Sequence, residues 1–411
     1  MANNLTYEQV YAVLNEVAKQ ATGADTLKAV DTASFVTVAQ TALKAGYDQV
    51  NNALSQVLSR TLFAVRPYSA KFKGLMADSI QYGNHVRKIN YVDKPAEENK
   101  TYSLTDGQSI DQYVIKKPEA IQTNFYGGGL WSDHITRFST QLKQAFRGPD
   151  ELGQYIEGFM LEWSNKHEQE NESMARACLC NFIAGKVAGD TANVIHLLTE
   201  YNALTGLQLT DTTVYQPDNF AAFMRWAYGR IAGICAMLTE RSIKFHTNLN
   251  ISGEDKLFVR HTPYQDQKIY LTAQNRYQTE MQVLADTYHD NYLKLGDNET
   301  VNYWQDIDNP TTIEVYESYL KPDGSINVNP VSGAKPTKVE HIFGVIFDRE
   351  AVGTTIIEQS MNATPFNARG EYSNIWWNCN YRWWNDFTEN GVVLLGLIVL
   401  VGFVVLDFQQ V

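Results

Sequence analysis

The stretch of sequence that comes nearest to a catalytic motif lies at residues 167–171. It consists of His-Glu-Gln-Glu-Asn and matches the zinc-protease pattern H-E-x-x-H except at its last position. In that pattern two histidines one helical turn apart bind zinc, and the glutamate acts as a general base. Asn171 replaces the second histidine and is a poor zinc ligand. We therefore predict no metal here and expect the solvent-exposed middle of a helix.

Other candidate sites are also incomplete. Residues 126–131 are rich in glycine but lack the lysine and Ser/Thr of a phosphate-binding loop, so we expect a tight bend there. Asp386 and Glu389 could pair as acid and base, yet two acids at this spacing after a strand are common. The four cysteines have neither zinc-ligand spacing nor the density of a disulfide framework. We predict no catalytic residue, no cofactor and no metal.

A pattern of charges suggests recognition rather than catalysis. Seven basic residues lie between Arg60 and Lys94 against two acids, and seven acids lie between Asp150 and Glu172 against one lysine. The two runs are either separate solvated faces or complementary surfaces, with the basic segment lying across the acidic helix of a neighbouring copy. On the second hypothesis the contact residues are Arg66, Lys71, Lys73, Arg87, Lys88, Glu157, Glu162, Glu168, Glu170 and Glu172.

The composition indicates a folded chain of two or three domains. It has 411 residues, of which 44% are hydrophobic and 19% charged, and its net charge is −12. This charge argues against a protein that binds nucleic acid by neutralising phosphates. It does not exclude a wall that encloses nucleic acid. The first residues have neither the basic nor the apolar region of a signal peptide, so we expect none.

Hydrophobic periodicity predicts the elements that position these residues. An amphipathic helix follows a capping box at residues 6–9 and ends near Thr22. Residues 62–125 hold short extended pieces punctuated by glycine and proline, which indicates a long β-hairpin with little core of its own. A long helix begins at Pro149, where proline and two acids suit the first turn. The other expected elements are helices at 34–62, 219–240 and 270–295 and a buried strand at 342–347.

An aromatic segment near the C-terminus alternates between two faces. One face carries Ile375, Trp377, Cys379, Tyr381 and Trp383, and the other carries Trp376, Asn378, Asn380, Arg382 and Trp384. A period of two predicts a strand, because successive side chains point to opposite faces. The first face is apolar enough to lie on a core, and the second suits packing against another layer or another chain.

The apolar tail Val392–Leu406 is interrupted only by Gly396 and Gly402. A membrane-spanning helix needs about 18 apolar residues or more, and shorter runs are usually part of a core. The tail is rich in valine and contains glycine, which favours buried, bent strands. We therefore expect no membrane anchor. A tail-anchored membrane protein is kept as an alternative, and partition into detergent would support it.

The sequence Asn367-Ala368-Arg369-Gly370, followed by Tyr372 and the aromatic strand, resembles the C-terminal part of the major capsid proteins of small podophages. The order of expected elements also resembles that family over nearly the whole chain. The resemblance implies an α+β fold of the tailed-phage capsid type (the Hong Kong 97-like or Johnson fold). It divides the chain into an N-terminal helical arm (1–61), an extended loop (62–130), a peripheral domain with a long spine helix (131–190), an axial domain (191–340), and returning strands with the apolar tail (341–411).

The resemblance also implies a function and partners. The protein is expected to be a self-assembling subunit of an icosahedral head that encloses double-stranded DNA, and not an enzyme. Its main partner would be itself, in hexamers and pentamers, together with scaffolding, portal and head-fibre proteins. It would be made in the host cytoplasm and end in the virion. Residues expected to pack the peripheral domain are Arg369, Tyr372, Trp376, Trp377, Tyr381, Trp383 and Trp384. An enzyme on an aromatic-rich scaffold is the other alternative, and a pocket with convergent polar groups would support it.

Overall fold

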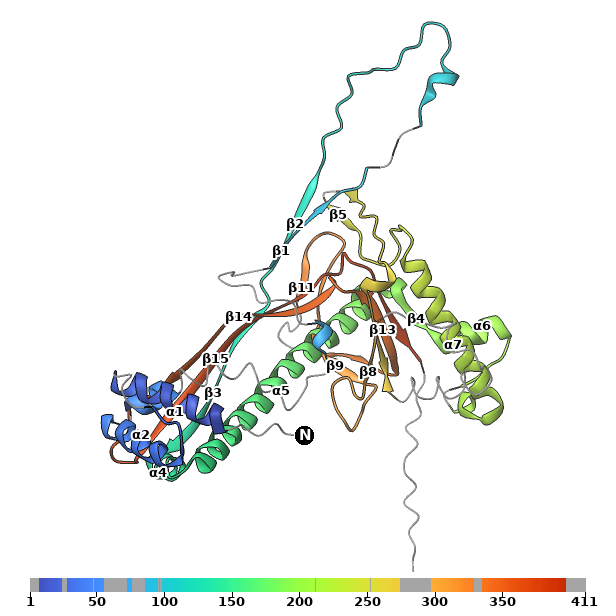
Figure 1. Cartoon of the computed structure of the whole chain (residues 1–411). Helices are drawn as coiled ribbons and strands as arrows, with labels where there is room; N and C mark the ends of the chain where they lie inside the picture. Colours follow the sequence, from blue (N-terminus) through green and yellow to red (C-terminus); the bar gives the residue numbers. More distant parts are fainter. Residues whose placement is uncertain are drawn as a thin grey trace, which may run out of the picture. The chain divides into compact units, whose positions relative to one another are not determined.

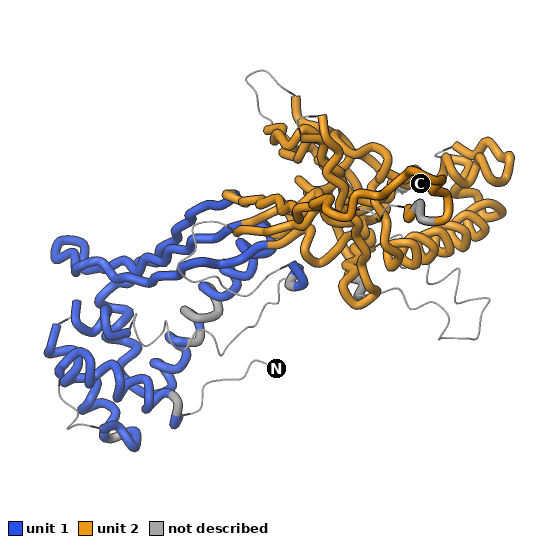
Figure 2. Tube along the Cα trace, turned by 90° about the horizontal axis from the view of Figure 1, so that it is seen from above, with its two compact units in different colours: residues 1–84, 127–174, 354–382 blue, residues 85–126, 175–353, 383–411 orange. Residues whose placement is uncertain are grey.

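The chain folds into helices and sheets that form two compact units. The computed structural model describes residues 7–23, 28–46, 48–54, 72–75, 86–94, 96, 98–210, 212–251, 253–273, 297–328 and 335–396. Unit 1 comprises residues 1–84, 127–174 and 354–382, and unit 2 comprises residues 85–126, 175–353 and 383–411 (Figure 2). Helix α5 and strands β14 and β15 each contribute residues to both units. The division into five segments expected from the sequence stays a prediction.

Unit 1 packs helices against a three-stranded sheet. The helices are α1 (Tyr7–Thr22), α2 (Thr32–Ala45), α4 (Ser139–Ala145) and the first part of α5 (Pro149–Gly189). The sheet has the order β14 (Val352–Ala363), β15 (Tyr372–Asn385), β3 (Gly128–Phe138), and β15 pairs antiparallel to β3 (Figure 1). Leu14, Phe35, Leu142, Ile156 and Ile375 are among the buried side chains of its core.

The second expected helix is shorter than predicted. Helix α2 begins after Asp31, whose side chain accepts a hydrogen bond from the Ser34 backbone N–H in a reciprocal capping box. It ends at Gly46, which has a φ of 117°. Residues other than glycine rarely adopt this backbone conformation. A single helix over residues 34–62 is therefore wrong, and residues 48–54 form a separate helical segment.

Unit 2 is built on a five-stranded mixed sheet. Its strand order is β4 (Val194–His196), β16 (Gly391–Leu395), β13 (Ile342–Asp348), β7 (Gln267–Thr272), β8 (Asp297–Val301). Helices α6 (Leu197–Thr205) and α7 (Pro217–Leu238) contribute to the hydrophobic core on one face. On the other face, the Phe182 ring of α5 lies 5.7 Å from the Phe347 ring. The expected strand at 342–347 is confirmed, and so is the expected helix at 219–240.

The helix expected from residue 270 onward is wrong at its start, because residues 267–272 form strand β7. Ile269, Tyr270 and Leu271 are buried, and β7 pairs with β13 on one side and β8 on the other. A short, continuous apolar run fits a central strand as well as a helix. Residues 274–296 lie outside the described residues.

Three small two-stranded sheets and several single turns complete the described elements. Two of these pairs are hairpins of consecutive strands, β5 (Leu249–Ile251) with β6 (Glu254–Lys256) and β10 (Ser318–Leu320) with β11 (Ile326–Val328). The third pair, β9 (Ile313–Val315) with β12 (Thr337–Val339), joins the strands on either side of the second hairpin. Within the described residues, short 3-10 turns occur at Lys73–Leu75, Lys100–Ser103, Thr191–Asn193, Thr213–Tyr215 and Tyr264–Asp266.

The beginning of the apolar tail is part of the sheet. Strand β16 lies between β4 and β13, and Val392, Val393 and Leu394 are fully buried. Residues 397–411 lie outside the described residues. Among the helices that the structure describes, none is both long and apolar enough to cross a membrane.

A two-stranded hairpin belongs to unit 2, as expected for part of residues 62–125. It pairs β1 (Val86–Tyr91) antiparallel with β2 (Ala120–Phe125). Figure 1 shows residues 94–118 as a loop beyond the ends of these two strands. We call β1 and β2, with Val92, Asp93 and Glu119, the arm stem, and residues 94–118 the arm end. Ile80 and Tyr82, which were also expected to be extended, lie outside the described residues.

Candidate functional site

The arm stem has two different faces. Arg87, Ile89 and Tyr91 alternate with Lys88 and Asn90 along β1. The first three are exposed, and the side chains of Ile89 and Tyr91 retain 51% and 72% of their accessible surface. Asn90 is buried and Lys88 is half-buried. The stem therefore rests on unit 2 through one face and leaves an apolar and basic face uncovered by the described residues.

Lys88 has its ion-pair partners within its own chain. Its Nζ lies 2.6 Å from Glu389 Oε1, 3.0 Å from Asp386 Oδ2 and 3.2 Å from Glu350 Oε2. The sequence hypothesis placed Lys88 in a contact between subunits and described the hairpin as having little core of its own. In the structure, alternation along β1 directs Lys88 toward its own unit. Asp386 and Glu389 bind this lysine rather than forming a catalytic acid and base.

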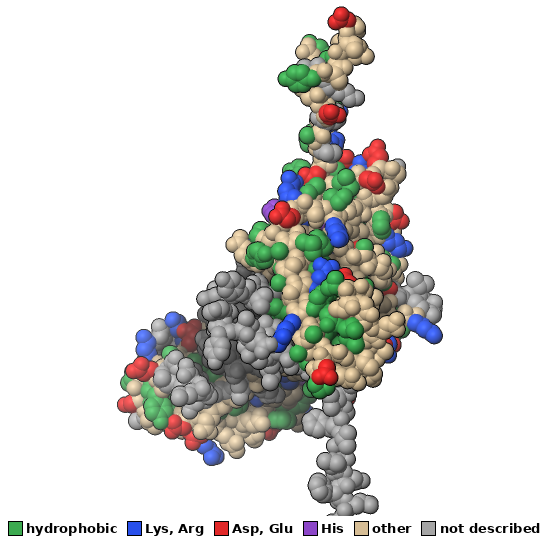
Figure 3. All heavy atoms as spheres, turned by 90° about the vertical axis from the view of Figure 1, so that its right-hand side faces the viewer, with side chains coloured by type: hydrophobic (Ala, Val, Ile, Leu, Met, Phe, Trp, Pro, Cys, Tyr) green, Lys and Arg blue, Asp and Glu red, His purple; other side chains and the backbone are tan. Residues whose placement is uncertain are grey.

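The arm end carries apolar side chains that the described residues do not cover. Every residue from 94 to 118 whose burial the structure describes is exposed. The large apolar side chains among them are Tyr102, Leu104, Ile110, Tyr113, Val114 and Ile115. Figure 3 shows hydrophobic side chains on the surface of this segment. The two legs of the loop meet where Lys94 Nζ donates to the Lys117 carbonyl at 2.7 Å.

The acidic run on α5 is only partly exposed. Ser164, Glu168 and Glu172 are buried. Their spacing of four places them on one face of the helix. Glu170, by contrast, is exposed. The expectation of a solvent-exposed middle is therefore wrong for this face of α5. The side chains of Glu157, Glu162 and Lys73 lie outside the described residues, as do Arg66 and Lys71.

His167 is packed among tryptophans rather than near a metal site. Its ring stacks on Trp163 at 5.3 Å and meets Trp377 edge-on at 4.5 Å. The side-chain amide nitrogens of Asn171 and Gln359 lie 3.2 Å and 3.4 Å from Nε2. No group of three or more potential metal ligands occurs in the described part of the chain.

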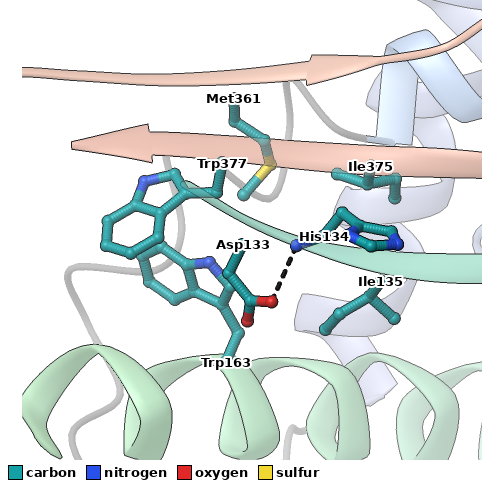
Figure 4. A pocket seen from close by; sticks show the side chains of 7 residues that line it. All are labelled: Asp133, His134, Ile135, Trp163, Met361, Ile375 and Trp377. Atoms are coloured by element: carbon teal, nitrogen blue, oxygen red, sulfur yellow. Dashed lines mark hydrogen bonds between the residues drawn. The ribbon is translucent and has the colours of Figure 1, made fainter. Parts of the chain in front are cut away.

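A small cavity lies between the sheet and α5, beside this cluster. It has a volume of about 10 Å³. It is lined by Asp133, His134, Ile135, Trp163, Met361, Ile375 and Trp377 (Figure 4). A cavity of this size holds at most about one water molecule. It therefore does not support the alternative of an enzyme.

A larger cleft, of about 410 Å³, lies beside the arm stem. Its charged residues are largely paired with each other: Arg349 binds Asp266 at 3.1 Å, and Arg260 binds Glu389 at 3.1 Å. The lining is Arg241, Val259, Arg260, His261, Pro263, Asp266, Asp348, Arg349, Glu350 and Glu389. Three arginines and four acids line the cleft, so neither sign of charge dominates it.

The strand predicted from the aromatic segment is confirmed as β15. Ile375, Trp377 and Cys379 are buried on the face toward α5, and Trp376 lies on the opposite face, stacked on His134 at 4.4 Å. Tyr381 lies across Gly129 of β3, where an added Cβ would be 2.5 Å from the hydroxyl oxygen. The glycines at 128 and 129 thus make room for cross-strand side chains in a strand, and the expected tight bend is wrong.

The turn before β15 explains the motif at 367–372. The Asn367 side-chain oxygen accepts hydrogen bonds from the backbone N–H groups of Arg369 and Gly370, both at 3.1 Å. A side chain at Gly370 would collide with the Tyr372 ring. Arg369 itself is exposed at the turn. In unit 2, Trp383 is half-buried and the Trp384 ring lies over Gly353, its Nε1 donating to the Glu350 carbonyl at 3.2 Å.

The α+β fold of the chain is that of the tailed-phage capsid proteins. The sequence model of the Phi29-like phage major capsid protein family matches residues 12–395, and the chain belongs to this family. It is a phage major capsid protein, and the resemblance seen in the sequence is confirmed.

Two solved structures illustrate the likeness of fold. One is a structure of the head fibre and inner core protein of native bacteriophage P68. A chain in that structure has a TM-score of 0.52 at 11% sequence identity. The match covers 81% of this chain and 86% of that chain. The other is the capsid structure of Staphylococcus phage Andhra, with a TM-score of 0.49 at 11% identity and coverage of 82% and 86%. No curated protein matches the chain by sequence.

Proposed function

We propose that copies of this capsid protein form an icosahedral shell around double-stranded DNA, with the arm of each copy lying over a neighbouring copy. The observation that carries the proposal is the arm end, where every residue of described burial is exposed, beyond a stem held on its own unit. Membership of a capsid family supports assembly from copies of the same chain.

Apolar contact is the main force that we propose for the arm end. Residues 94–118 contain four lysines and four acids, so their formal charges cancel. Tyr102, Tyr113 and Ile115 keep at least 79% of their accessible surface. Burial of apolar surface contributes roughly 25 cal/mol per Å². Each contact is weak, but a closed shell repeats it many times.

Charge contributes a smaller part of the proposed contact. Arg87 on the outer face of the stem and Glu170 on α5 are both described and exposed. We propose that they meet between copies, together with Arg66, Lys71, Lys73, Glu157 and Glu162. Complementary charges of this kind set register and speed association more than they add affinity.

Other partners follow from the same role. We propose scaffolding, portal and head-fibre proteins as partners, synthesis in the host cytoplasm, and a final place in the virion. The role requires no catalysis and no cofactor. We also propose that Arg369, Tyr372, Trp376, Trp377, Tyr381, Trp383 and Trp384 serve the packing of the peripheral domain. A net charge of −12 suits a wall that encloses DNA without binding its phosphates tightly.

The proposal is tested by removing apolar side chains from the arm end. We expect the double variant Tyr113→Ser with Ile115→Ser to stay folded, because neither side chain contributes to the core of its own subunit. We expect it to remain unassembled at concentrations where the wild type forms shells, as judged by sedimentation velocity and negative-stain microscopy. Ser109→Ala with Gln112→Ser, in the same loop, is the control and should assemble. Normal shells from both double variants would contradict the proposal.

A further inference from the structure

The inward face of the arm stem meets a group of charged and polar side chains that the capsid family assignment does not explain. We propose that this group, which we call the arm anchor, is a positioning site that fixes the direction of the arm before assembly. The arm anchor consists of Lys88, Asn90, Arg260, Asp386, Thr388 and Glu389, with Glu350 at its edge. This inference rests on the proposed function of the arm.

Lys88 is the centre of the arm anchor. Its side chain is 19% exposed, and those of Asp386 and Glu389 are 1% and 8% exposed. Burial alone would lower the pKa of Lys88, but the carboxylates of Asp386 and Glu389 hold it above its usual range. Removing one partner of such a buried pair leaves an uncompensated charge, which is strongly unfavourable. The stem therefore cannot leave this position without exposing or breaking the pair.

Asn90 and Arg260 extend the contact along the strand. Arg260 Nη2 donates to Asn90 Oδ1 at 2.9 Å, and Arg260 Nε donates to the Thr388 carbonyl at 3.1 Å. Asn90 Nδ2 donates to Thr388 Oγ1 at 3.4 Å. Arg260 also pairs with Glu389, which binds Lys88. The two inward side chains of β1 are thus joined to one short segment, residues 386–389, by a connected network.

A third contact holds the outer end of the stem. The Asp93 backbone N–H donates to the Leu257 carbonyl at 3.0 Å, and its carboxylate accepts from the Val259 N–H at 2.9 Å. Glu119, which directly precedes β2, binds Lys256 at 2.9 Å. Positions 88 and 90 lie on β1, which rises about 3.4 Å per residue, and Asp93 lies two residues beyond the end of β1. Three contacts along one line fix a direction, whereas one would allow the stem to pivot.

The contacts divide the arm into a fixed stem and a projecting end. Isolated two-stranded hairpins are marginally stable in water, so the stem depends on the arm anchor and on the Asp93 and Glu119 contacts to keep one orientation. With these contacts in place, the arm end begins at the same position in every copy. Ordering the stem before contact lowers the entropic cost of binding. We infer that shells close because each arm has a fixed direction before the subunits meet.

The test compares two changes at adjacent positions of β1. Lys88→Met keeps the length of the side chain but removes its charge, and Arg87→Met makes the same change on the outward face. Hydrogen exchange of unassembled subunits, at concentrations below assembly, is measured by mass spectrometry. We expect stem amides in Lys88→Met to exchange on the order of 100-fold faster than in wild type, and those in Arg87→Met to exchange at the wild-type rate. Lys88→Arg, which keeps the charge, should retain most of the protection.

Amides of β13 and α7 report whether unit 2 stays folded. If Lys88→Met loosens these as well, Asn90→Ala becomes the deciding variant, since it removes the bridge to Arg260 and Thr388 without leaving a buried charge. It should accelerate stem exchange about tenfold with β13 unchanged. Wild-type protection of the stem in the deciding variant would overturn the inference.

Assembly is then scored for the same variants by microscopy. Malformed or open particles from subunits with a loosened stem support a positioning role, and normal shells from such subunits overturn it. The exchange measurement does not require assembly. A wild-type protein that forms no shells would therefore contradict the proposed function and leave the result on the stem standing.

Discussion

The four cysteines show how burial decides the chemistry of single residues. Cys178, Cys180, Cys235 and Cys379 are all buried and unpaired with each other. Burial raises the pKa of Cys178, Cys180 and Cys235 to about 12 and that of Cys379 to about 11. The thiolate is the reactive form of cysteine. The native protein therefore presents thiols that are both inaccessible and protonated.

We predict that iodoacetamide at pH 8 labels none of these cysteines in the folded subunit and all of them in urea, as read by intact mass. The raised pKa values of the four thiols should also make the free energy of unfolding depend on pH. The folded chain keeps thiol protons that the unfolded chain loses above pH 9.0, so the free energy of unfolding should fall as the pH rises from about 9 to about 12. A variant with all four cysteines changed to alanine should lose this part of the dependence. Rapid native labelling at any one site would contradict the burial of that residue.

Two glycines show how the surrounding element sets the effect of one substitution. A Cβ at Gly344, in the buried strand β13, would lie 2.7 Å from the Tyr270 carbonyl oxygen and 2.6 Å from a methyl carbon of Leu271. A Cβ at Gly229, on the exposed side of α7, would meet nothing within 4 Å. Overpacking a core costs about 1–3 kcal/mol, and replacing an exposed helical glycine by alanine stabilises by about 1 kcal/mol.

We therefore expect opposite signs for the same chemical change. Gly344→Ala should lower the midpoint of urea unfolding, and Gly229→Ala should raise it, relative to the wild type. Each variant is the control for the other, because both add one methyl group to unit 2. Equal shifts in the two variants would show that packing at these positions does not decide stability.

The elements differ in how far the sequence predicts them. Helix α7 and strand β15 have unambiguous periods of about 3.6 and of 2, and the structure confirms both. The predicted helix at 270–295 is wrong over residues 270–272, because their pairing with β13 and β8 decides their conformation and sequence periodicity does not contain that pairing. Gly46 is a local signal for the end of a helix. Helical apolar periodicity continues beyond it, however, and this favoured a single long helix over residues 34–62.

The arm anchor was beyond sequence analysis for a different reason. Lys88 and Glu389 are 301 positions apart, and only the fold brings them together. The cluster Asp386-Phe387-Thr388-Glu389-Asn390 did contain a usable signal, since two acids and an asparagine stand between a strand and an apolar run. Buried acids require partners, and the period-two pattern of β1 could have marked Lys88 as inward.

At the scale of the whole molecule, a shell repeats each contact between subunits many times, so the free energy of a single contact is multiplied. An exposed ion pair stabilises by only about 0–1 kcal/mol. A subunit in a closed shell makes each contact with its neighbours at the same time, so small losses accumulate in the concentration at which shells appear. The structure leaves Arg87 exposed on the stem and Glu170 exposed on α5. These two residues are therefore the best probes of the proposed contact between charge runs.

We predict that Arg87→Glu raises the critical concentration for assembly, measured by light scattering, while the subunit stays folded, since Arg87 points away from the arm anchor. Glu170→Lys should raise it by a similar amount. The double reversal restores opposite charges, so it should assemble closer to the wild type than either single variant. All four proteins should converge at high salt, because the Debye length falls to about 3 Å at 1 M. Additive defects without rescue would show that these charge runs do not meet, and the arm would then act through its apolar end alone.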